Sequence, residues 1–404
     1  MMLKLALRNI FRQKVRTAMT LAAIVVSVVA LILSGGFVQD IFIQLGEAII
    51  HSQSGHVQVA RKGYFREGSR KPEQYLIADP GSVARRLASI DGVVDVMARL
   101  GFSALLNNGR SDLSVVGEGI EPDREARAGT YLRIRVGRQL GVDDGYAILV
   151  GEGVARSLQV APGDRVTLLL ATPDGAMNAL DFEVVGVFES FSKDYDARTV
   201  KIPLPAAQGL LNTIGANVLV VSLKKTGDTR RVAGTATAML SDQGLEVQRW
   251  ESLNDFYAKT VELYDRQLGV LRIIVLLMVL LGVTNTVNMT IYERTGEVGT
   301  MRAMGNRRPF VFSLLITESG LLGLIGGVIG VVAGIALAKI ISQIGIPMPP
   351  PPNANLGYLA QIRVLPSVVA SAFLVGSVAP IAASILPALR ASRLAVGEAL
   401  RHNA

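Results

Sequence analysis

Four long apolar stretches divide this chain, at roughly residues 17–38, 271–291, 310–341 and 364–389. About 20 consecutive apolar residues are enough to cross a bilayer as a helix. The hydropathy pattern therefore predicts an α-helical membrane protein with four transmembrane helices.

The first and second spans are both expected to continue outward beyond the membrane. After the first apolar stretch, apolar residues still recur at helical spacing, at Val38, Ile41, Phe42, Leu45 and Ile49. A similar pattern over residues 252–268 runs directly into the second span. We therefore predict one helix over 17–51 and a second helix, stalk and span together, over 252–291. The first apolar stretch is long for a signal peptide, so we interpret it as a retained span.

Residues 52–251 carry mixed strand and helix patterns, which predicts a large α/β extracytoplasmic domain inserted between the first two spans. We predict that a β-rich part at 111–210 is inserted into an α/β part built from 52–110 and 211–251. Strands are expected over 55–59, 146–150, 165–170, 182–188 and 217–223. Helices are expected over 82–90, 153–158 and 228–240.

The remaining segments are short. They are an N-terminal basic segment at 1–16, a loop at 292–309, spans at 310–341 and 364–389, a proline-rich outer loop at 342–363 and a tail at 390–404. The run Pro349–Pro352 is expected to be stiff and non-helical. The fourth span is expected to end near Pro387.

The net charge of +8 is concentrated in three of these segments, namely 1–16, 292–309 and 390–404. Excess Lys and Arg in short loops indicates the cytoplasmic side of a membrane. We therefore place both termini in the cytoplasm and the large domain in the periplasm of a cell with an inner membrane. The rest of the chain is nearly neutral, so no nucleic-acid partner is predicted.

No catalytic or metal site is predicted. The chain has no Cys, and its three His residues show no metal-ligand spacing with carboxylates. The strand, GEGVAR and helix at 146–156 lack the third glycine of a dinucleotide loop, because Arg156 stands there. Paired aspartates at 143–144 and 194–196 are interpreted as turn residues. We do not expect this chain to be an enzyme by itself.

The third span contains overlapping GxxxG pairs, which let a neighbouring helix approach closely in lipid. These glycines are interpreted as a helix-packing face and are Gly323, Gly326, Gly327, Gly330 and Gly334. The same span carries Glu318, a carboxylate that needs a partner or the headgroup region. Polar residues near the inner end of the second span are its expected partners, namely Thr284, Asn285, Thr286 and Asn288.

Three segments resemble one family. LALRNIFRQKVRTAMTLAAIVVSV near the N-terminus, ERTGEVGTMRAMGNRR after the second span and LPALRASRLAVGEALR near the C-terminus are similar to the FtsX-like, MacB-like ABC transporter permeases. AILVGEGVARSLQVAPGDRVTLLL resembles part of the periplasmic domain of that family. The segment SGHVQVARKGYF is most similar to the stand-alone lipoprotein-release permeases.

The resemblance implies mechanotransmission. A cytoplasmic dimer of ATPase subunits binds ATP and Mg²⁺ and passes its closure to a coupling helix between spans two and three. No Walker A motif occurs in this sequence, so we expect the ATPase to be a separate chain. The residues that match the coupling segment are Glu293, Arg294, Glu297, Gly299, Arg302 and Gly305, with Glu297 and Arg302 as the expected ATPase contacts. The alternative interpretation of this segment, without a coupling role, is an ordinary solvated loop whose positive charge marks the cytoplasmic side.

The resemblance also implies partners and a substrate. The permease is expected to be a dimer with a second copy or a paralogue, in contact with membrane lipid, and to release a lipoprotein, with a periplasmic adaptor or chaperone as a further partner. Substrate entry is hypothesised at Phe37, Val38, Ile41 and Phe42, which fit stalk packing equally well. One alternative is export of an antibiotic, peptide or lipid through an adaptor and an outer-membrane channel. Another is mechanical regulation of a periplasmic hydrolase without transport.

Overall fold

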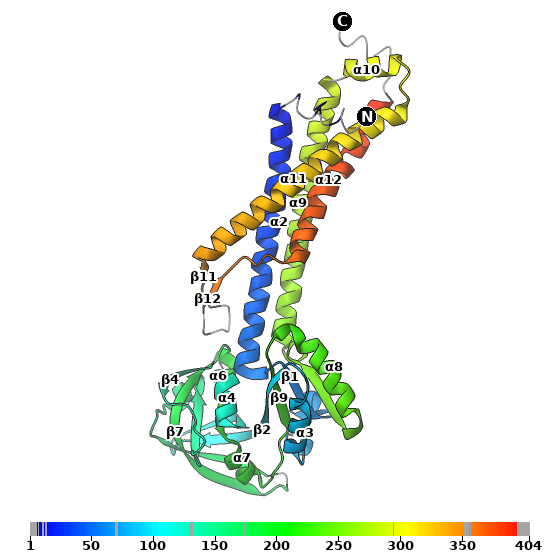
Figure 1. Cartoon of the computed structure of the whole chain (residues 1–404). Coiled ribbons are helices and arrows are strands. Elements are labelled where there is room, and N and C mark those ends of the chain that lie inside the picture. The colour runs from blue at the N-terminus through cyan, green and yellow to red at the C-terminus, as the bar shows by residue number, and fades with distance from the viewer. Residues whose placement is uncertain are drawn as a thin grey trace. The chain divides into compact units, whose positions relative to one another are not determined.

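The computed structural model describes residues 6, 8–9, 12, 14–68, 72–128, 132–172, 174–293, 295–350, 355 and 357–393. The chain divides into two compact units (Figure 1). The helical unit comprises Met1–Phe42, Thr260–Pro347 and Leu359–Ala404. The sheet unit comprises Ile43–Lys259 and Met348–Tyr358.

The helical unit is built from long apolar helices. They are α2 (Lys14–Ile49), α9 (Asp255–Glu293), α11 (Arg308–Ile344) and α12 (Pro366–Ser392), with the short α10 (Thr295–Ala303) between α9 and α11. Within the described residues, four helices are long and apolar enough to cross a membrane, as predicted. At 1.5 Å per residue, the 39 residues of α9 span about 58 Å, nearly twice the hydrocarbon thickness of a bilayer.

Helix α12 ends within a few residues of the end expected from sequence, although it contains two prolines. Pro380 and Pro387 both lie inside the helix, which continues to Ser392. A proline inside a helix leaves the carbonyl four residues earlier without its usual donor. For Pro387 that carbonyl belongs to Ala383, and the Thr284 hydroxyl of α9 donates to it at 3.2 Å. A neighbouring helix thus supplies the missing hydrogen bond, as is common in membranes.

One half of the sheet unit is a β-α-β-β-α-β arrangement. Its strands are β1 (Val57–Arg61), β2 (Val93–Asn107), β9 (Val218–Leu223) and β10 (Leu245–Arg249), in the order β10-β1-β9-β2 with antiparallel pairing. Helices α3 (Pro80–Ala88) and α8 (Thr229–Leu240) contribute Leu87 and Val232 to a core with Val59 and Leu219. This strand order and chain path are those of a ferredoxin-like fold.

The other half is a closed ring of strands inserted between β2 and β9. Its further strands are β3 (Asp112–Ile120), β5 (Ala147–Gly151), β6 (Arg165–Ala171), β7 (Met177–Glu189) and β8 (Thr199–Pro203). Pairing runs β2-β3-β8-β5-β7-β6 and back to β2, while β4 (Arg133–Gly137) pairs with β7 outside the ring. The short helices α5 (Glu152–Leu158), α6 (Lys193–Asp196) and α7 (Leu204–Leu211) pack on the ring, whereas Ala128 at the end of α4 (Pro122–Ala128) packs with Met97 and Val220 of the other half.

The two halves share strand β2. Residues Val93–Arg99 of β2 pair with β9, whereas Leu100–Asn107 pair with β3. The division between the two cores therefore falls inside β2, and not at the residue 110/111 boundary expected from sequence. A strand of 15 residues is long enough to serve both sheets.

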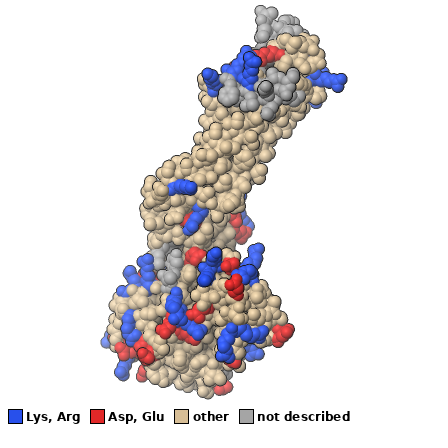
Figure 2. Space-filling model, viewed as in Figure 1, with Lys and Arg blue, Asp and Glu red and all other residues tan. Residues whose placement is uncertain are grey.

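The outer loop between α11 and α12 contains a small hairpin, β11 (Ile346–Met348) paired with β12 (Tyr358–Ala360). Pro351 and Pro352, the second half of the proline run, lie outside the described residues. Charged side chains cover the sheet unit and the end of the helical unit that carries α10 (Figure 2). The rest of the helical unit's surface carries few charged side chains in that view, as expected for a surface that faces lipid.

Candidate functional site

Helix α10 occupies the position predicted for the coupling segment. Gly296 and Gly299 lie inside α10 and are buried. Gly305 forms a turn, with a φ of +93° that favours glycine. The buried glycines let α10 lie close against its surroundings, where Met301 packs on the Val311 cluster.

The two residues expected to contact an ATPase make contacts within the chain. Glu297 accepts a hydrogen bond from Arg12 at 2.7 Å. Arg302 donates to the carbonyl of Ser392 at 3.0 Å, which caps the C-terminal end of α12. Both residues therefore tie α10 to other parts of the helical unit. Met304, just beyond the end of α10, is an apolar residue that is 72% exposed.

Of the other coupling residues, Glu293 is exposed at the end of α9, and Arg294 lies outside the described residues.

The residues hypothesised to admit substrate pack in the stalk. Val38 and Phe42 of α2 are buried against Leu268 of α9, with Phe37 beside them. The rings of Phe42 and Tyr264 meet edge to face, with centroids 6.1 Å apart. Ile41 is 9% exposed. In this arrangement these side chains form a helix–helix contact.

The glycines of α11 present two packing faces. A Cβ added to Gly326 would lie 2.8 Å from Ile24, and one added to Gly330 would lie 2.7 Å from Val28. Gly334 approaches Ile32 in the same way, so these glycines face α2. Two others, Gly323 and Gly327, face α12 at Ser377. Helix α11 therefore approaches two neighbours closely, on different sides.

Glu318 of α11 is 8% exposed and accepts a hydrogen bond from Asn9 at 2.5 Å. Asn9 was not among its expected partners. Of those expected partners, Thr284 donates to Ala383 and Thr286 donates to Gly282 of its own helix.

The GEGVAR turn has no space for a phosphate. A Cβ on Gly151 would lie 2.2 Å from the carbonyl oxygen of Asp196, and one on Gly153 would lie 2.5 Å from the Cα of Ala197. The chain at 196–197 thus fills the turn. These glycines serve close packing of the backbone, as the structural interpretation of the motif predicted.

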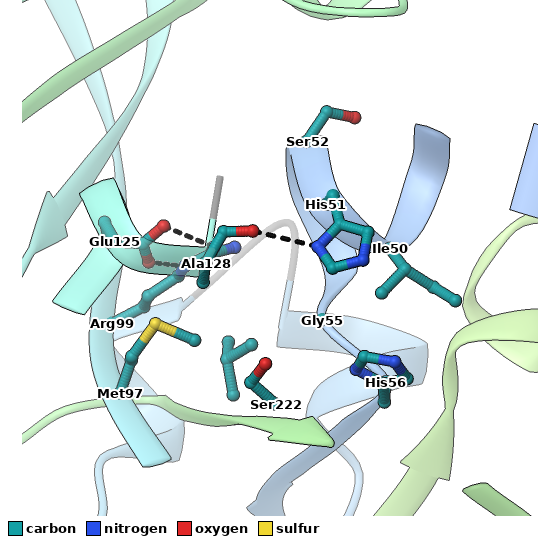
Figure 3. A pocket seen from close by; sticks show the side chains of 11 residues that line it. Ile50, His51, Ser52, Gly55, His56, Met97, Arg99, Glu125, Ala128 and Ser222 are labelled. Atoms are coloured by element: carbon teal, nitrogen blue, oxygen red, sulfur yellow. Dashed lines mark hydrogen bonds and ion pairs between the residues drawn. The ribbon is translucent and has the colours of Figure 1, made fainter. Parts of the chain in front are cut away.

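A polar pocket lies within the sheet unit, beside the residues that follow α2 (Figure 3). There α2 passes into a π-helical turn, η1 (Ile50–Ser54), and Gly55 at φ +61° turns the chain into β1. The pocket's cavity, about 10 Å³, is roughly the size of one water molecule. Such π-turns often mark functional positions in helices.

Hydrogen bonds fix this turn from several sides. His51 lies with Nδ1 3.0 Å from the Ala128 carbonyl, so that nitrogen donates (Figure 3). The buried His56 accepts the Leu223 N–H at Nδ1, which places the proton on Nε2, 3.3 Å from the Thr226 hydroxyl. That hydroxyl donates to Glu47 at 2.6 Å. Burial lowers the pKa of His56 to about 4, so His56 is neutral at physiological pH.

Two buried ion pairs in the sheet unit were not foreseen from the sequence. Arg99 pairs with Glu125, with Nη2 2.8 Å from Oε2 (Figure 3). It also donates to the Gln53 carbonyl. Lys201 is 2% exposed and donates to Glu118 at 2.7 Å. Burial alone would raise the pKa of Glu118, but the Lys201 and Arg99 charges lower it below its usual range.

The side chains of His51, His56, Arg99 and Lys201 each have a hydrogen-bond or ion-pair partner, so they hold segments of the sheet unit together. Among the described residues, no group of three or more His, Asp and Glu side chains could hold a metal ion.

Comparison with known proteins agrees with this description. Residues 17–239 match the family described as the MacB-like periplasmic core domain, and residues 269–396 match the FtsX-like permease C-terminal family. The chain belongs to the FtsX-like, MacB-like family of ABC transporter permeases. Family membership and four apolar helices make it an inner-membrane protein with a periplasmic domain, here the sheet unit.

Three relatives illustrate the range of the family. An uncharacterized ABC transporter permease of Methanocaldococcus jannaschii is 29% identical over 55% of this chain and 55% of its own length. A macrolide export ATP-binding/permease protein of Hyphomonas neptunium is 25% identical over 97% of this chain and 59% of its own. A lipoprotein-releasing system transmembrane protein of Haemophilus influenzae is 24% identical over 64% of this chain and 63% of its own. This chain thus spans a little over half the length of the first two.

Proposed function

We propose that this chain is the membrane subunit of an ABC transporter that releases lipid-anchored proteins from the inner membrane. A separate dimer of ATPase subunits in the cytoplasm binds ATP and Mg²⁺ and moves α10. The chain works with a second copy or a paralogue, and both of its termini face the cytoplasm. The movement of α10 reaches the sheet unit, which then drives the substrate out of the bilayer.

The continuity of α9 is the observation that supports this proposal most directly. Its first residues, up to Lys259, belong to the sheet unit, and its last residue, Glu293, stands two positions before α10 begins. A continuous helix transmits displacement along its axis, because each backbone hydrogen bond would have to break for it to fold or stretch. One uninterrupted helix therefore joins the coupling segment to the periplasmic domain.

The apolar contact between α2 and α9 supports an amphiphilic substrate. Val38, Phe42 and Leu268 meet on the outward part of these helices. An acyl chain that entered between the helices would replace apolar contacts with apolar contacts, at little cost in hydrophobic burial. The relative named for lipoprotein release supports a lipid-anchored protein as the proposed substrate.

Breaking α9 in the middle tests the coupling. Gly269 has no heavy atom within 4 Å of an added Cβ, so a proline there meets no neighbour while it removes a helical hydrogen bond. In proteoliposomes that contain the ATPase and a lipoprotein, we expect Gly269→Pro to hydrolyse ATP but to lose most release per ATP. The matched Gly269→Ala variant should behave as wild type.

Two results would contradict the proposal. Full release by Gly269→Pro would show that α9 does not carry the movement. Wild-type complex that hydrolyses ATP and leaves the lipoprotein in the membrane would exclude lipoprotein release. Export of a small molecule with an adaptor and an outer-membrane channel would then be tested next, since the macrolide-export relative covers nearly all of this chain.

A further inference from the structure

The loop between α11 and α12 contributes a second, separate segment of chain to the sheet unit. Most of the sheet unit is one continuous segment, Ile43–Lys259, reached through α2 and α9. Its other segment is Met348–Tyr358, which follows one part of the helical unit and precedes another along the sequence. The chain therefore passes between the units four times, and two of these passages belong to the loop that carries β11 and β12 (Figure 1).

Asn355 fastens this loop to the sheet unit. Its side-chain Nδ2 donates to the Asp196 carboxylate at 2.6 Å and to the Ser190 carbonyl at 3.1 Å. Its backbone N–H donates to the Phe191 carbonyl at 3.1 Å. Asp196 and Ser190 are almost fully buried, at 2% and 0% exposed. Hydrogen bonds to a charged acceptor are stronger than those between neutral groups, so this is a specific attachment.

The receiving corner, where β7 ends and α6 begins, is rigid. Both carboxylate oxygens of Asp196 lie 3.0 Å from the Ser190 N–H, which fixes the side chain. The Ser192 side chain caps α6. Gly151 and Gly153 bring the β5–α5 turn against the backbone of residues 196–197. A pull on Asn355 therefore acts on the strand ring as a whole.

The other end of the loop is fixed to the helical unit. The carboxylate of Asp40 in α2, which is 0% exposed, accepts from the Arg363 side chain at 2.7 Å and from the Gln361 N–H at 2.8 Å. The Ile362 N–H donates to the hydroxyl of Ser342 in α11 at 2.9 Å. Residues 361–363, which shortly precede α12 in sequence, are thus bound to two other spans, α2 and α11.

We propose that the covalent connection from Asn355 to Gln361 acts as a mechanical strap, which limits how far the β7–α6 corner can move from Asp40 of α2 and Ser342 of α11. The strap's two anchors are six residues apart in sequence. A fully extended chain spans at most 3.3–3.6 Å per residue, so these anchors can separate by no more than about 20 Å while both hold. The stalk helices and the strap then constrain the periplasmic domain together. This inference concerns the mechanics of the chain and does not depend on the transported substrate.

The strap is tested by measuring this distance limit in the full-length protein. Nitroxide labels at Lys193→Cys, beside one anchor, and Val364→Cys, beside the other, report the separation of the anchors by electron–electron resonance, in a background that has no native Cys. Measurements at pH 8 keep Asp196 ionised, because burial raises its pKa only to about 6. Asn355→Asp removes both side-chain donors and places a second carboxylate beside Asp196.

We expect the wild-type distances to stay within the limit set by an extended strap, about 20 Å between anchors plus the label arms. Asn355→Asp should add a population at longer distances. The same substitution at exposed Asn212, a residue in the left-handed region that Asp also adopts, should leave the distribution unchanged. Asp196→Asn combined with Asn355→Asp restores a donor–acceptor pair and should remove part of the long-distance population. An Asn355→Asp distribution identical to that of wild type would overturn the proposal.

No ATPase or substrate is present in this measurement, so its result stands apart from that of the release assay. Amide hydrogen exchange at Asn355 supplies a second readout, since its N–H is bonded to Phe191 only while the strap is attached. Faster exchange in Asn355→Asp with an unchanged distance distribution would show a loop that detaches without restraining anything, and would also overturn the proposal.

Discussion

In the sheet unit most of the large apolar side chains are buried, whereas in the helical unit many of them are exposed. Phe182, Leu168 and Ile148 of the strand ring are at most 1% exposed. Leu277, Met278 and Leu281 of α9 are more than half exposed, and so is Val332 of α11. The hydrophobic effect accounts for the burial in the sheet unit, since burial removes apolar surface from water. Lipid provides no such drive, so the helices associate through close approach at Gly326 and Gly330 instead.

The difference indicates which kind of substitution should destabilise each unit. In the sheet unit, stability depends on filling the space between strands. In the helical unit, stability depends on keeping particular positions empty. Removing atoms should therefore harm the first unit, and adding atoms should harm the second.

The largest expected effect comes from removing a buried side chain in the sheet unit. Leu168 is fully buried in the ring core, so Leu168→Ala should lower the free energy of unfolding of this unit by about 2–5 kcal/mol. Leu277→Ala in α9, which removes the same atoms from an exposed position, should change stability very little. Chemical unfolding of both variants in detergent, followed by hydrogen exchange in each unit, measures the difference. Equal losses in the two variants would mean that the contrast between the units is wrong.

Adding one methyl group to the glycine face should have the next largest effect. The new Cβ of Gly330→Ala would lie 2.7 Å from Val28, so α2 and α11 must separate, at a cost of about 1–3 kcal/mol. Gly282→Ala in α9 meets nothing within 4 Å and should stabilise its helix by up to about 1 kcal/mol through helix propensity. The thermal midpoints of the two variants should therefore move in opposite directions. A rise for Gly330→Ala would show that the glycines are not needed for close approach.

The smallest effect is a pH dependence confined to the sheet unit. Because the pKa of His56 is about 4 in the folded chain and near 6.5 in the unfolded chain, the unfolded state binds more protons between these values. The stability contributed by neutral His56 is thus complete above pH 6.5 and is lost as the pH falls toward 4. At pH 5.5 the loss is about 1 kcal/mol.

His56→Asn retains an acceptor for the Leu223 N–H but cannot titrate. Subtracting its unfolding free energy from that of wild type at pH 7.5 and 5.5 isolates the His56 contribution from other titrating groups. Asp196 is one of these, and its raised pKa of about 6 acts in the opposite direction, stabilising the fold as the pH falls through 6. A difference that does not change with pH would contradict a buried neutral His56.

Sequence patterns were sufficient for the spans and for the strands with strong periodicity. The strand expected at 165–170 is β6, and the helix expected at 228–240 is α8. The long strand β2 was not predicted, because its faces pack against two different cores and its apolar residues keep no single alternation. The continuation of α12 through Pro387 depends on the Thr284 hydroxyl of another helix, which no local pattern reveals.

The predicted coupling segment is a helix at the expected place, but its contacts could not be predicted. Glu297 and Arg302 find Arg12 and Ser392, residues that are far away in sequence and adjacent only in the folded unit. The same holds for Asn355, which stands among prolines and gave no signal of its own. Partners at long sequence separation are set by topology, and topology is what a single sequence specifies least directly.

The glycine face of α11 also bears on the order in which the chain is made. Ile24 and Val28 of α2 are synthesised near the beginning, whereas Gly326 and Gly330 follow about three hundred residues later. Since synthesis proceeds at about 5–20 residues per second, the first span resides in the bilayer for some tens of seconds before its partner helix exists. During that interval residues 43–259 of the periplasmic domain can fold, and the segment Met348–Tyr358 is added after α11 has been made. Assembly of the helices is therefore the last step of biogenesis, and a defect at these glycines should leave a folded periplasmic domain on an unassembled membrane unit.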